Sequence, residues 1–185
     1  MTAMPTFTGL GDGPTVLMLH GIGGGHLAFA PQVETFAGAG YRAVAWDMPG
    51  YGHSAPIEPY TFKGLAESCI TLIEALLAGE QNLPTPHASD ADDSPGAGIA
   101  AERGGLILLG HSMGGMVAQE VVARRPDLVR ALVLVGTSPA FARKPDGSYS
   151  ETFARKFVAD RAAPLDAGQS MAEVASRLVP GMVGP

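Results

Sequence analysis

Four short apolar runs, each followed by glycine or turn residues, constrain the fold of this chain more than any other feature. They read TVLMLH at residues 15–20, YRAVAW at 41–46, LILLG at 106–110 and ALVLVG at 131–136. Apolar runs of this length, with little alternation between apolar and polar residues, are typical of strands buried on both faces of a sheet. The sequence therefore predicts a sheet that is covered on both sides.

The segments between these runs have the spacing of helices. One helix is expected from about Pro31 to Ala39, because proline favours a helix start and Gly40 follows its end. Thr61 can cap a longer helix, whose apolar face consists of Phe62, Leu65, Ala66, Cys69, Ile70, Ile73, Leu76 and Leu77. A third helix is expected from Ser112 to about Arg125, before Pro126. Strands that alternate with helices predict a mainly parallel sheet in a three-layer α/β/α fold.

Connection rules also predict the order of the strands across the sheet. The expected order is 41–46, 15–20, 106–110 and 131–136. The chain reverses direction between the strands at 15–20 and 106–110, and open α/β sheets bind ligands at such a switch point. A ligand site is therefore expected where these two strands end.

Composition and charge exclude several functions. The net charge is −6 and the basic residues form no cluster, so nucleic acid is not expected as a partner. The single cysteine, Cys69, lies on a helical apolar face and is interpreted as a core residue. No apolar run approaches the roughly 20 residues of a membrane span, and the first residues lack the features of a signal peptide. We therefore expect a soluble cytoplasmic protein.

Two regions have weak patterns. Residues 79–104 are small, polar and rich in proline, glycine and aspartate, and they form either a disordered insertion, which we favour, or a functional loop. Residues 139–185 contain weak helical patches near Phe153 to Asp160 and Met171 to Leu178, without a convincing strand. The core is therefore expected to lie within residues 1–138.

The pentapeptide Gly110-His111-Ser112-Met113-Gly114 has the G-x-S-x-G pattern between a predicted strand and a predicted helix. A sharp strand-to-helix turn strains the serine backbone and needs tiny residues two positions away on either side. Such a turn exposes the hydroxyl above a helix N-terminus, where backbone N–H groups stabilise a developing anion. Ser112 is therefore predicted to be a nucleophile; the alternative is a serine that caps a helix in a glycine-rich turn.

A second motif, His20-Gly21-Ile22, follows the first strand and should lie beside Ser112. The expected oxyanion donors are the backbone N–H groups of Ile22 and Met113. The glycines at 21–25 could instead form a flexible turn, and they lack the spacing of a nucleotide phosphate loop. His20 itself is interpreted as a structural residue.

Together, the motifs LMLHGIGG, WDMPGYGHS and LLGHSMGGMVAQE resemble the α/β-hydrolase superfamily, in its order, over about residues 14–138. The last motif is most similar to enol-lactonases and small-ester hydrolases. The resemblance implies a Ser-acid-His triad, a mechanism without cofactor or metal, and a helical cap that starts within residues 139–185. It also implies structural roles for Asp47 and His53.

The histidine and acid of such a triad follow the serine along the chain. The five histidines are His20, His26, His53, His87 and His111, and none follows Ser112. Adjacent side chains in an extended turn should point apart, which argues against His111. Asp146, Asp160 and Asp166 fall in the expected start of the cap. The triad acid and histidine are therefore expected to be absent, either because the chain is truncated after the fourth strand or because it is a degenerate, non-catalytic family member.

We accordingly expect a serine hydrolase fold that acts on a small carboxylic ester or lactone through an acyl-enzyme at Ser112. The chain as given should be an incomplete and practically inactive fragment. The alternatives are acyl transfer or cofactor-free perhydrolysis on the same fold, or a ligand-binding module without turnover. Dehalogenases and epoxide hydrolases of the superfamily use an aspartate nucleophile, which Ser112 disfavours. The uncharged strand 131–136 could also support self-association through its edge.

Overall fold

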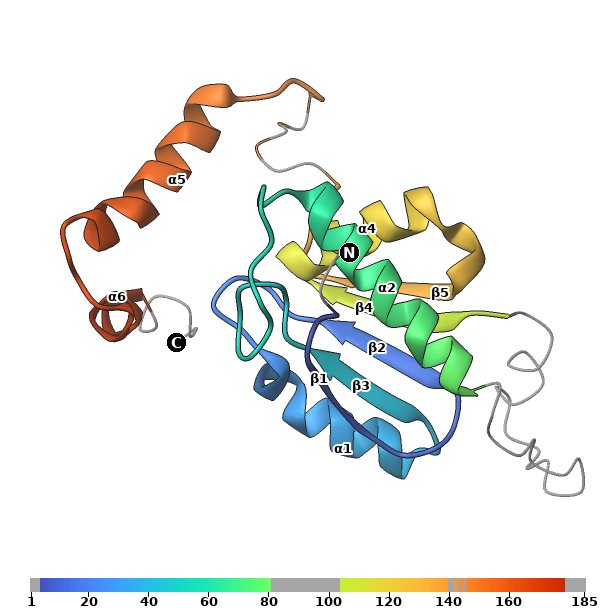
Figure 1. Cartoon of the computed structure of the whole chain (residues 1–185). Helices are drawn as coiled ribbons and strands as arrows, with labels where there is room; N and C mark the ends of the chain where they lie inside the picture. The colour runs from blue at the N-terminus through green and yellow to red at the C-terminus, as the bar shows by residue number, and fades with distance from the viewer. Residues whose placement is uncertain (1–3, 81–103, 140–141, 143, 145, 179–185) are drawn as a thin grey trace, which may run out of the picture. The chain divides into compact units, whose positions relative to one another are not determined.

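The computed structural model of the protein (Figure 1) describes residues 4–80, 104–139, 142, 144 and 146–178. The chain divides into two compact units, residues 1–139 and 140–185. This division falls beside the boundary that the sequence suggests after residue 138. The interpretation of the second unit as the start of a cap stays a prediction.

The first unit is built on one five-stranded sheet with the order β1-β3-β2-β4-β5. The strands are β1 (Phe7–Leu10), β2 (Thr15–Leu19), β3 (Arg42–Trp46), β4 (Leu106–His111) and β5 (Val129–Val135). Strand β1 is antiparallel to β3, whereas β3, β2, β4 and β5 are parallel to one another. The predicted fold class and the predicted order of the four parallel strands are confirmed.

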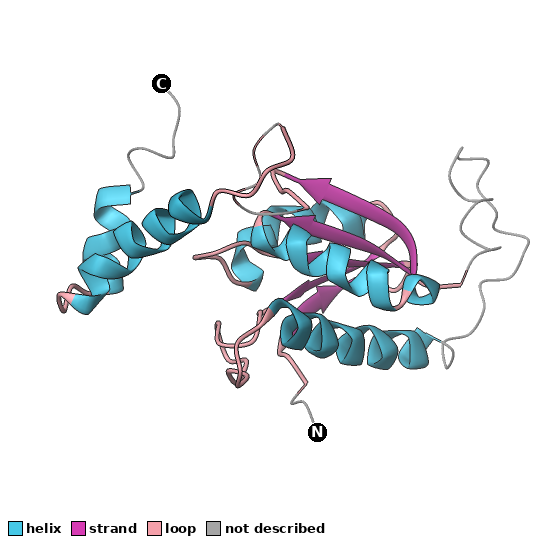
Figure 2. Ribbon diagram, turned by 90° about the horizontal axis from the view of Figure 1, so that it is seen from above, coloured by secondary structure: helices cyan, strands magenta, loops and turns pink. Residues whose placement is uncertain are grey.

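Helices cover both faces of the sheet (Figures 1 and 2). The helices of the first unit are α1 (Ala30–Gly38), α2 (Phe62–Glu80) and α4 (Met113–Arg124), with short 3-10 helices η1 (His26–Phe29) and η3 (Pro126–Leu128). Side chains of β2 alternate between two buried clusters. Leu17 and Leu19 pack with residues of α2 and α4, and Val16 and Met18 pack with Val33 of α1. The period of two along a strand thus produces the three layers.

Helix α2 forms for the reasons that its sequence indicates. Thr61 Oγ1 accepts the Gly64 N–H at 3.1 Å, which satisfies one of the unpaired donors at the helix start. Cys69 is completely buried in the cluster below α2, and this burial raises the pKa of its thiol. The helix also includes Gly79 and Glu80, so these two residues do not belong to the insertion that the sequence predicts at 79–104. Residues 81–103 lie outside the described residues, so the predicted disordered insertion stays a prediction.

Strand β5 differs from its neighbours in burial. Its residues Ala131–Val135 are exposed, although they are apolar and pair with β4 along their length. Within the described ranges, no further strand pairs with the outer edge of β5. The self-association through this strand that the sequence suggests stays a prediction.

The second unit contains two helices, α5 (Glu151–Asp166) and α6 (Met171–Leu178). Ser150 Oγ accepts the Phe153 N–H at 3.3 Å and caps α5. The two helical patches in the sequence are therefore helices, the first of them longer than its pattern indicates. No helix in the described part of either unit is long and apolar enough to cross a membrane.

Candidate active site at the carboxyl ends of the strands

Ser112 lies at the turn between β4 and α4, with a strained backbone (φ 52°, ψ −120°). A non-glycine residue in such a conformation costs about 1–3 kcal/mol and persists only where the surroundings enforce it. Four hydrogen bonds do so here, one of them from the Met116 N–H to the Ser112 carbonyl at 3.3 Å. The Ser112 N–H donates to the Val135 carbonyl at 3.0 Å, and the Ser112 carbonyl accepts from Thr137 Oγ1 at 2.7 Å and from the Gly115 N–H at 3.0 Å.

Three glycines allow the chain to pass tightly around Ser112. A methyl group at Gly110 would lie 2.5 Å from Gly115 Cα, and one at Gly114 would overlap the carbonyl oxygens of Leu19 and His20. A methyl group at Gly21 would lie 2.9 Å from Ser112 Cβ and 3.3 Å from Ser112 Oγ. The turn therefore has the close backbone packing of a nucleophile elbow.

The segment 20–26 follows β2 and is termed the oxyanion loop below. The side of Gly21 Cα where a Cβ would stand faces Ser112, and the Gly24 N–H donates to the Gly21 carbonyl at 3.2 Å. Gly23 has a φ of 76°, at the turn position where a positive φ favours glycine. Ile22 precedes it and is 67% exposed, so burial does not hold this residue in place.

The two predicted oxyanion donors come from this loop and from α4. Met113 is the first residue of α4, where a backbone N–H has no intrahelical acceptor. Among the backbone bonds outside regular elements in the described residues, neither Ile22 nor Met113 donates its N–H. The structure thus brings Ser112 and the Gly21-Ile22 segment together, at the switch point between β2 and β4.

His111 lies closer to this site than the sequence argument suggests. A methyl group at Gly21 would be 3.3 Å from His111 Nδ1 as well as from Ser112 Oγ. The two adjacent side chains therefore border the same glycine and do not simply point apart. The reason is the sharp turn at Ser112, which interrupts the alternation of an extended strand.

His20 is buried and holds the start of the oxyanion loop. Its Nε2 is 3.0 Å from the Met48 backbone N, and its Nδ1 is 2.8 Å from the Gly21 carbonyl oxygen. Because a backbone N–H can only donate, Nε2 accepts and Nδ1 carries the proton, so the imidazole is neutral. Burial lowers the pKa of His20. This contact set gives His20 the structural role that the sequence predicts.

Asp47, directly after β3, is also buried and structural. Its carboxylate accepts from the His26 backbone N–H at 2.9 Å, from His26 Nδ1 at 3.0 Å and from Thr6 Oγ1 at 3.1 Å. Burial alone would raise the pKa of Asp47, but the hydrogen bonds from His26 and Thr6 outweigh it and lower the pKa. The pairing with His26 was not predicted, because residues 26 and 47 are far apart in sequence and share no motif.

The acidic residues in the expected start of the cap make contacts within their own unit. Asp160 pairs with Lys156 on α5 at 2.9 Å, and Asp146 accepts from Ser148. His53 is exposed, and His87 lies outside the described residues. The described residues also contain no cluster of three or more side chains that could hold a metal ion.

The fold, the strained serine at the strand-to-helix turn and the adjacent glycine loop define an α/β-hydrolase core. The model of the alpha/beta hydrolase family matches residues 16–184. The chain therefore belongs to the alpha/beta hydrolase family.

Individual relatives agree with this assignment. A pimeloyl-[acyl-carrier protein] methyl ester esterase from Chromobacterium violaceum is 32% identical over 157 residues, covering 85% of this chain and 49% of the relative. The crystal structure of an epoxide hydrolase from Vigna radiata is 27% identical and has a TM-score of 0.56, covering 76% of this chain and 37% of that one. An esterase from Exiguobacterium antarcticum shares the fold, with 23% identity, a TM-score of 0.64, and coverage of 85% and 51%. The chain spans about half the length of the curated esterase relatives it matches.

Proposed function

We propose that the protein is a serine hydrolase whose nucleophile is Ser112 and whose substrates are small carboxylic esters or lactones. The observation that carries this proposal is the geometry of Ser112. A positive-φ serine stands between two obligatory glycines, with the backbone of Gly21 against its side chain. A serine that merely caps a helix needs neither this strain nor this contact, and Ser112 makes no side-chain cap bond to α4.

The proposed reaction passes through an acyl-enzyme. Ser112 Oγ attacks the substrate carbonyl and loses its proton to a general base, while the carbonyl oxygen becomes an oxyanion. The N–H groups of Ile22 and Met113 donate to that oxyanion, and the alcohol leaves with a proton. Water then attacks the acyl group and restores the serine hydroxyl.

The substrate class is supported by a relative and by the identity of the nucleophile. The relative from Chromobacterium violaceum is named for hydrolysis of a methyl ester. Epoxide hydrolases are also similar to this chain. The family resemblance implies an aspartate nucleophile in those enzymes, whereas this chain has Ser112 at the corresponding turn. An ester or lactone carbonyl is the electrophile that a serine of this geometry attacks best.

The general base is the part of the machinery that this sequence does not supply in the family's order, since no histidine follows Ser112. We therefore propose that the 185-residue chain alone has only residual activity. Oxyanion stabilisation and binding without a working triad leave about 10³–10⁴-fold catalysis over water. The cytoplasmic location stays a prediction from the sequence.

The test is hydrolysis of a p-nitrophenyl ester by the purified chain and by its Ser112→Ala variant. We expect the parent chain to release p-nitrophenol faster than the variant, which keeps only the part of the rate that oxyanion stabilisation and binding supply. Both proteins should have the same circular dichroism spectrum. An equal rate in both proteins would reject Ser112 as the nucleophile. Transfer of the acyl group to an added alcohol or to hydrogen peroxide, in preference to water, would favour acyl transfer or perhydrolysis. Saturable ester binding without any Ser112-dependent turnover would favour a binding module.

A further inference from the structure

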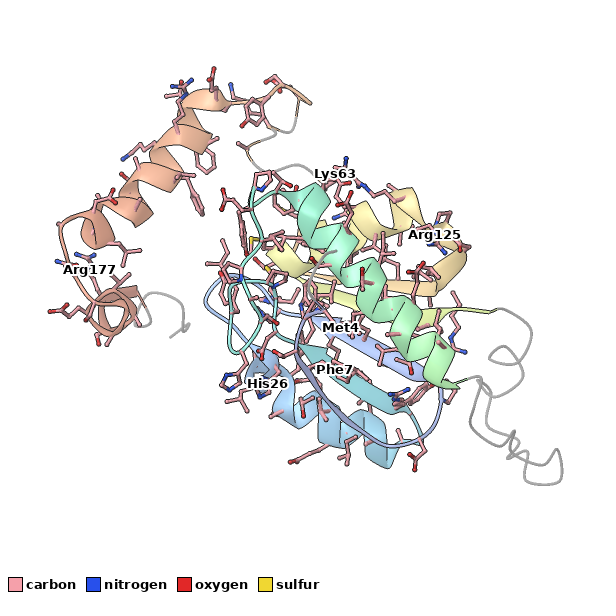
Figure 3. All side chains as sticks on the ribbon, viewed as in Figure 1. Met4, Phe7, His26, Lys63, Arg125 and Arg177 are labelled. Carbon is pink, nitrogen blue, oxygen red and sulfur yellow. The ribbon has the colours of Figure 1, made fainter. Side chains whose placement is uncertain are left out.

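The oxyanion loop is attached at both ends to the residues that follow β3. At its start, His20 Nε2 accepts the Met48 N–H at 3.0 Å. At its end, His26 donates to the Asp47 carboxylate through its backbone N–H at 2.9 Å and through Nδ1 at 3.0 Å. His26 lies at the turn before α1, on the side of the molecule where α1 begins (Figure 3).

Apart from the turn bond between the Gly24 N–H and the Gly21 carbonyl, little fixes the middle of the loop. Gly23, Gly24 and Gly25 have no side chains, and a methyl group at Gly23 would contact nothing within 4 Å. Ile22 is exposed, so its side chain adds little packing. The direction of the Ile22 N–H therefore depends on the attachments at His20 and at His26.

The acceptor for His26 is itself fixed. The Asp47 side chain is only 3% exposed, Thr6 Oγ1 donates to its second oxygen, and a methyl group at Gly52 would overlap its carboxyl group. The neighbouring Ser54 Oγ donates to the Asp47 carbonyl at 2.6 Å and accepts the Thr6 N–H at 2.8 Å. A buried carboxylate held in this way is a rigid anchor for one hydrogen-bonding side chain.

We propose that His26 and Asp47 are positioning residues that orient the Ile22 N–H toward the oxyanion formed at Ser112. This inference rests on the proposed function of Ser112. The hydrogen bond from His26 Nδ1 to Asp47 holds the last residue of the loop beside the end of β3. This attachment restricts the backbone conformations that the loop glycines can adopt. The pair acts through the loop and does not touch the reacting atoms.

Misorientation of the Ile22 N–H should affect the rate of reaction more than the binding of the substrate. An oxyanion donor acts mainly when charge develops on the carbonyl oxygen, and loss of one such donor lowers the rate about 10²–10³-fold in serine hydrolases. A donor that is misoriented and not removed should cost less, about tenfold or more. Half-saturation by substrate should remain nearly unchanged, because the ground-state carbonyl depends less on that donor.

The matched variants are His26→Leu, which removes the ring donor, and His26→Asn, whose Nδ2 can donate from nearly the same position as Nδ1. His53→Leu is the control, because His53 is an exposed histidine in the turn that follows Asp47. The measurement is the rate of acylation of Ser112 by p-nitrophenyl acetate in the full chain, as a function of ester concentration. A second measurement is hydrogen exchange of the backbone amides at 21–25.

We expect His26→Leu to slow acylation about tenfold or more at unchanged half-saturation, and His26→Asn and His53→Leu to stay within about threefold of the parent. Equal acylation in His26→Leu and the parent, or an Asn variant as slow as the Leu variant, would overturn the proposal. If the parent chain is not acylated at Ser112, the proposed function fails, and hydrogen exchange still tests the anchor. Faster exchange at 21–25 in His26→Leu but not in His26→Asn supports the anchor, and unchanged exchange in both rejects it.

Discussion

At the scale of single residues, the site depends on glycine positions that leave no room for a Cβ atom. Gly114 is the clearest case, because the carbonyl oxygens of Leu19 and His20 occupy the place of a Cβ. Gly38, in α1, has nothing within 4 Å of the same place. Both glycines lie in helices, Gly114 in the first turn of α4 and Gly38 at the end of α1, and only Gly114 has such a contact.

Gly114→Ala should therefore destabilise the protein by about 3 kcal/mol, near the upper end of the cost of overpacking. Gly38→Ala should be neutral or stabilising by up to about 1 kcal/mol, since alanine favours a helix over glycine. Urea unfolding of both variants measures this difference. Equal stabilities of the two variants would mean that α4 does not pack against the end of β2 as described.

The buried imidazole of His20 makes the free energy of unfolding depend on pH. The pKa of His20 is lowered in the folded state, so the unfolded chain binds the proton more tightly. The stabilisation is then complete above the unfolded pKa of about 6.5 and is lost as the pH falls below it. We expect the free energy of unfolding to fall between pH 6.5 and pH 5, with a slope of at most about 1.4 kcal/mol per pH unit from this group.

His20→Gln separates this contribution from those of other groups, because glutamine can still accept the Met48 N–H and does not titrate. The variant should have a flatter dependence of unfolding free energy on pH over this range, measured by urea unfolding at several pH values. If the slope were the same in both proteins, His20 would not be held neutral by burial.

At the scale of elements, local patterns decided what the sequence could predict. Strands β2 to β5 were predicted because each is a short apolar run, and three of them are buried between helices. Strand β1 was missed. Thr8 and Gly9 interrupt its apolar residues, and the strand is exposed along its length. It is held by backbone pairing with β3.

Some features of the site depend on local sequence and others on the tertiary fold. Ser112, Gly110 and Gly114 could be found because the elbow is a local turn with fixed spacing. The Asp47–His26 contact could not be found, since it joins residues whose proximity depends on how β3 ends beside the oxyanion loop. The closeness of His111 Nδ1 to Gly21 likewise depends on the backbone angles at Ser112.

Strand β5 is the element with the most direct consequence for solution behaviour. Leu132, Val133, Leu134 and Val135 are each 37–46% exposed, and exposed apolar edges are templates for pairing with another chain. We expect association of the purified chain that increases with concentration in sedimentation velocity experiments. Val133→Lys should shift the protein toward monomer, whereas Val158→Lys on α5, the control at another exposed valine, should not. A parent chain that stays monomeric at every concentration would reject this role of β5.

At the scale of the whole molecule, the chain has the sheet of an alpha/beta hydrolase and a strained serine at the glycine-rich turn after β4, and its sequence contains no histidine after Ser112. The central claim is that Ser112 is nevertheless a nucleophile. Trypsin should release it in the peptide 104–124, between Arg103 and Arg124, so its modification can be observed directly.

The decisive measurement is therefore mass spectrometry of this peptide after the full chain is incubated with p-nitrophenyl acetate and quenched in acid. We expect an added acetyl group of about 42 Da on Ser112, as formation of an ester at the serine requires, and none on the same peptide from Ser112→Ala. A Gly21→Val variant should also accumulate less of the adduct, because its side chain would displace the loop from Ser112. An unmodified Ser112 peptide, or an acetyl group found on His111 and not on Ser112, would contradict the account.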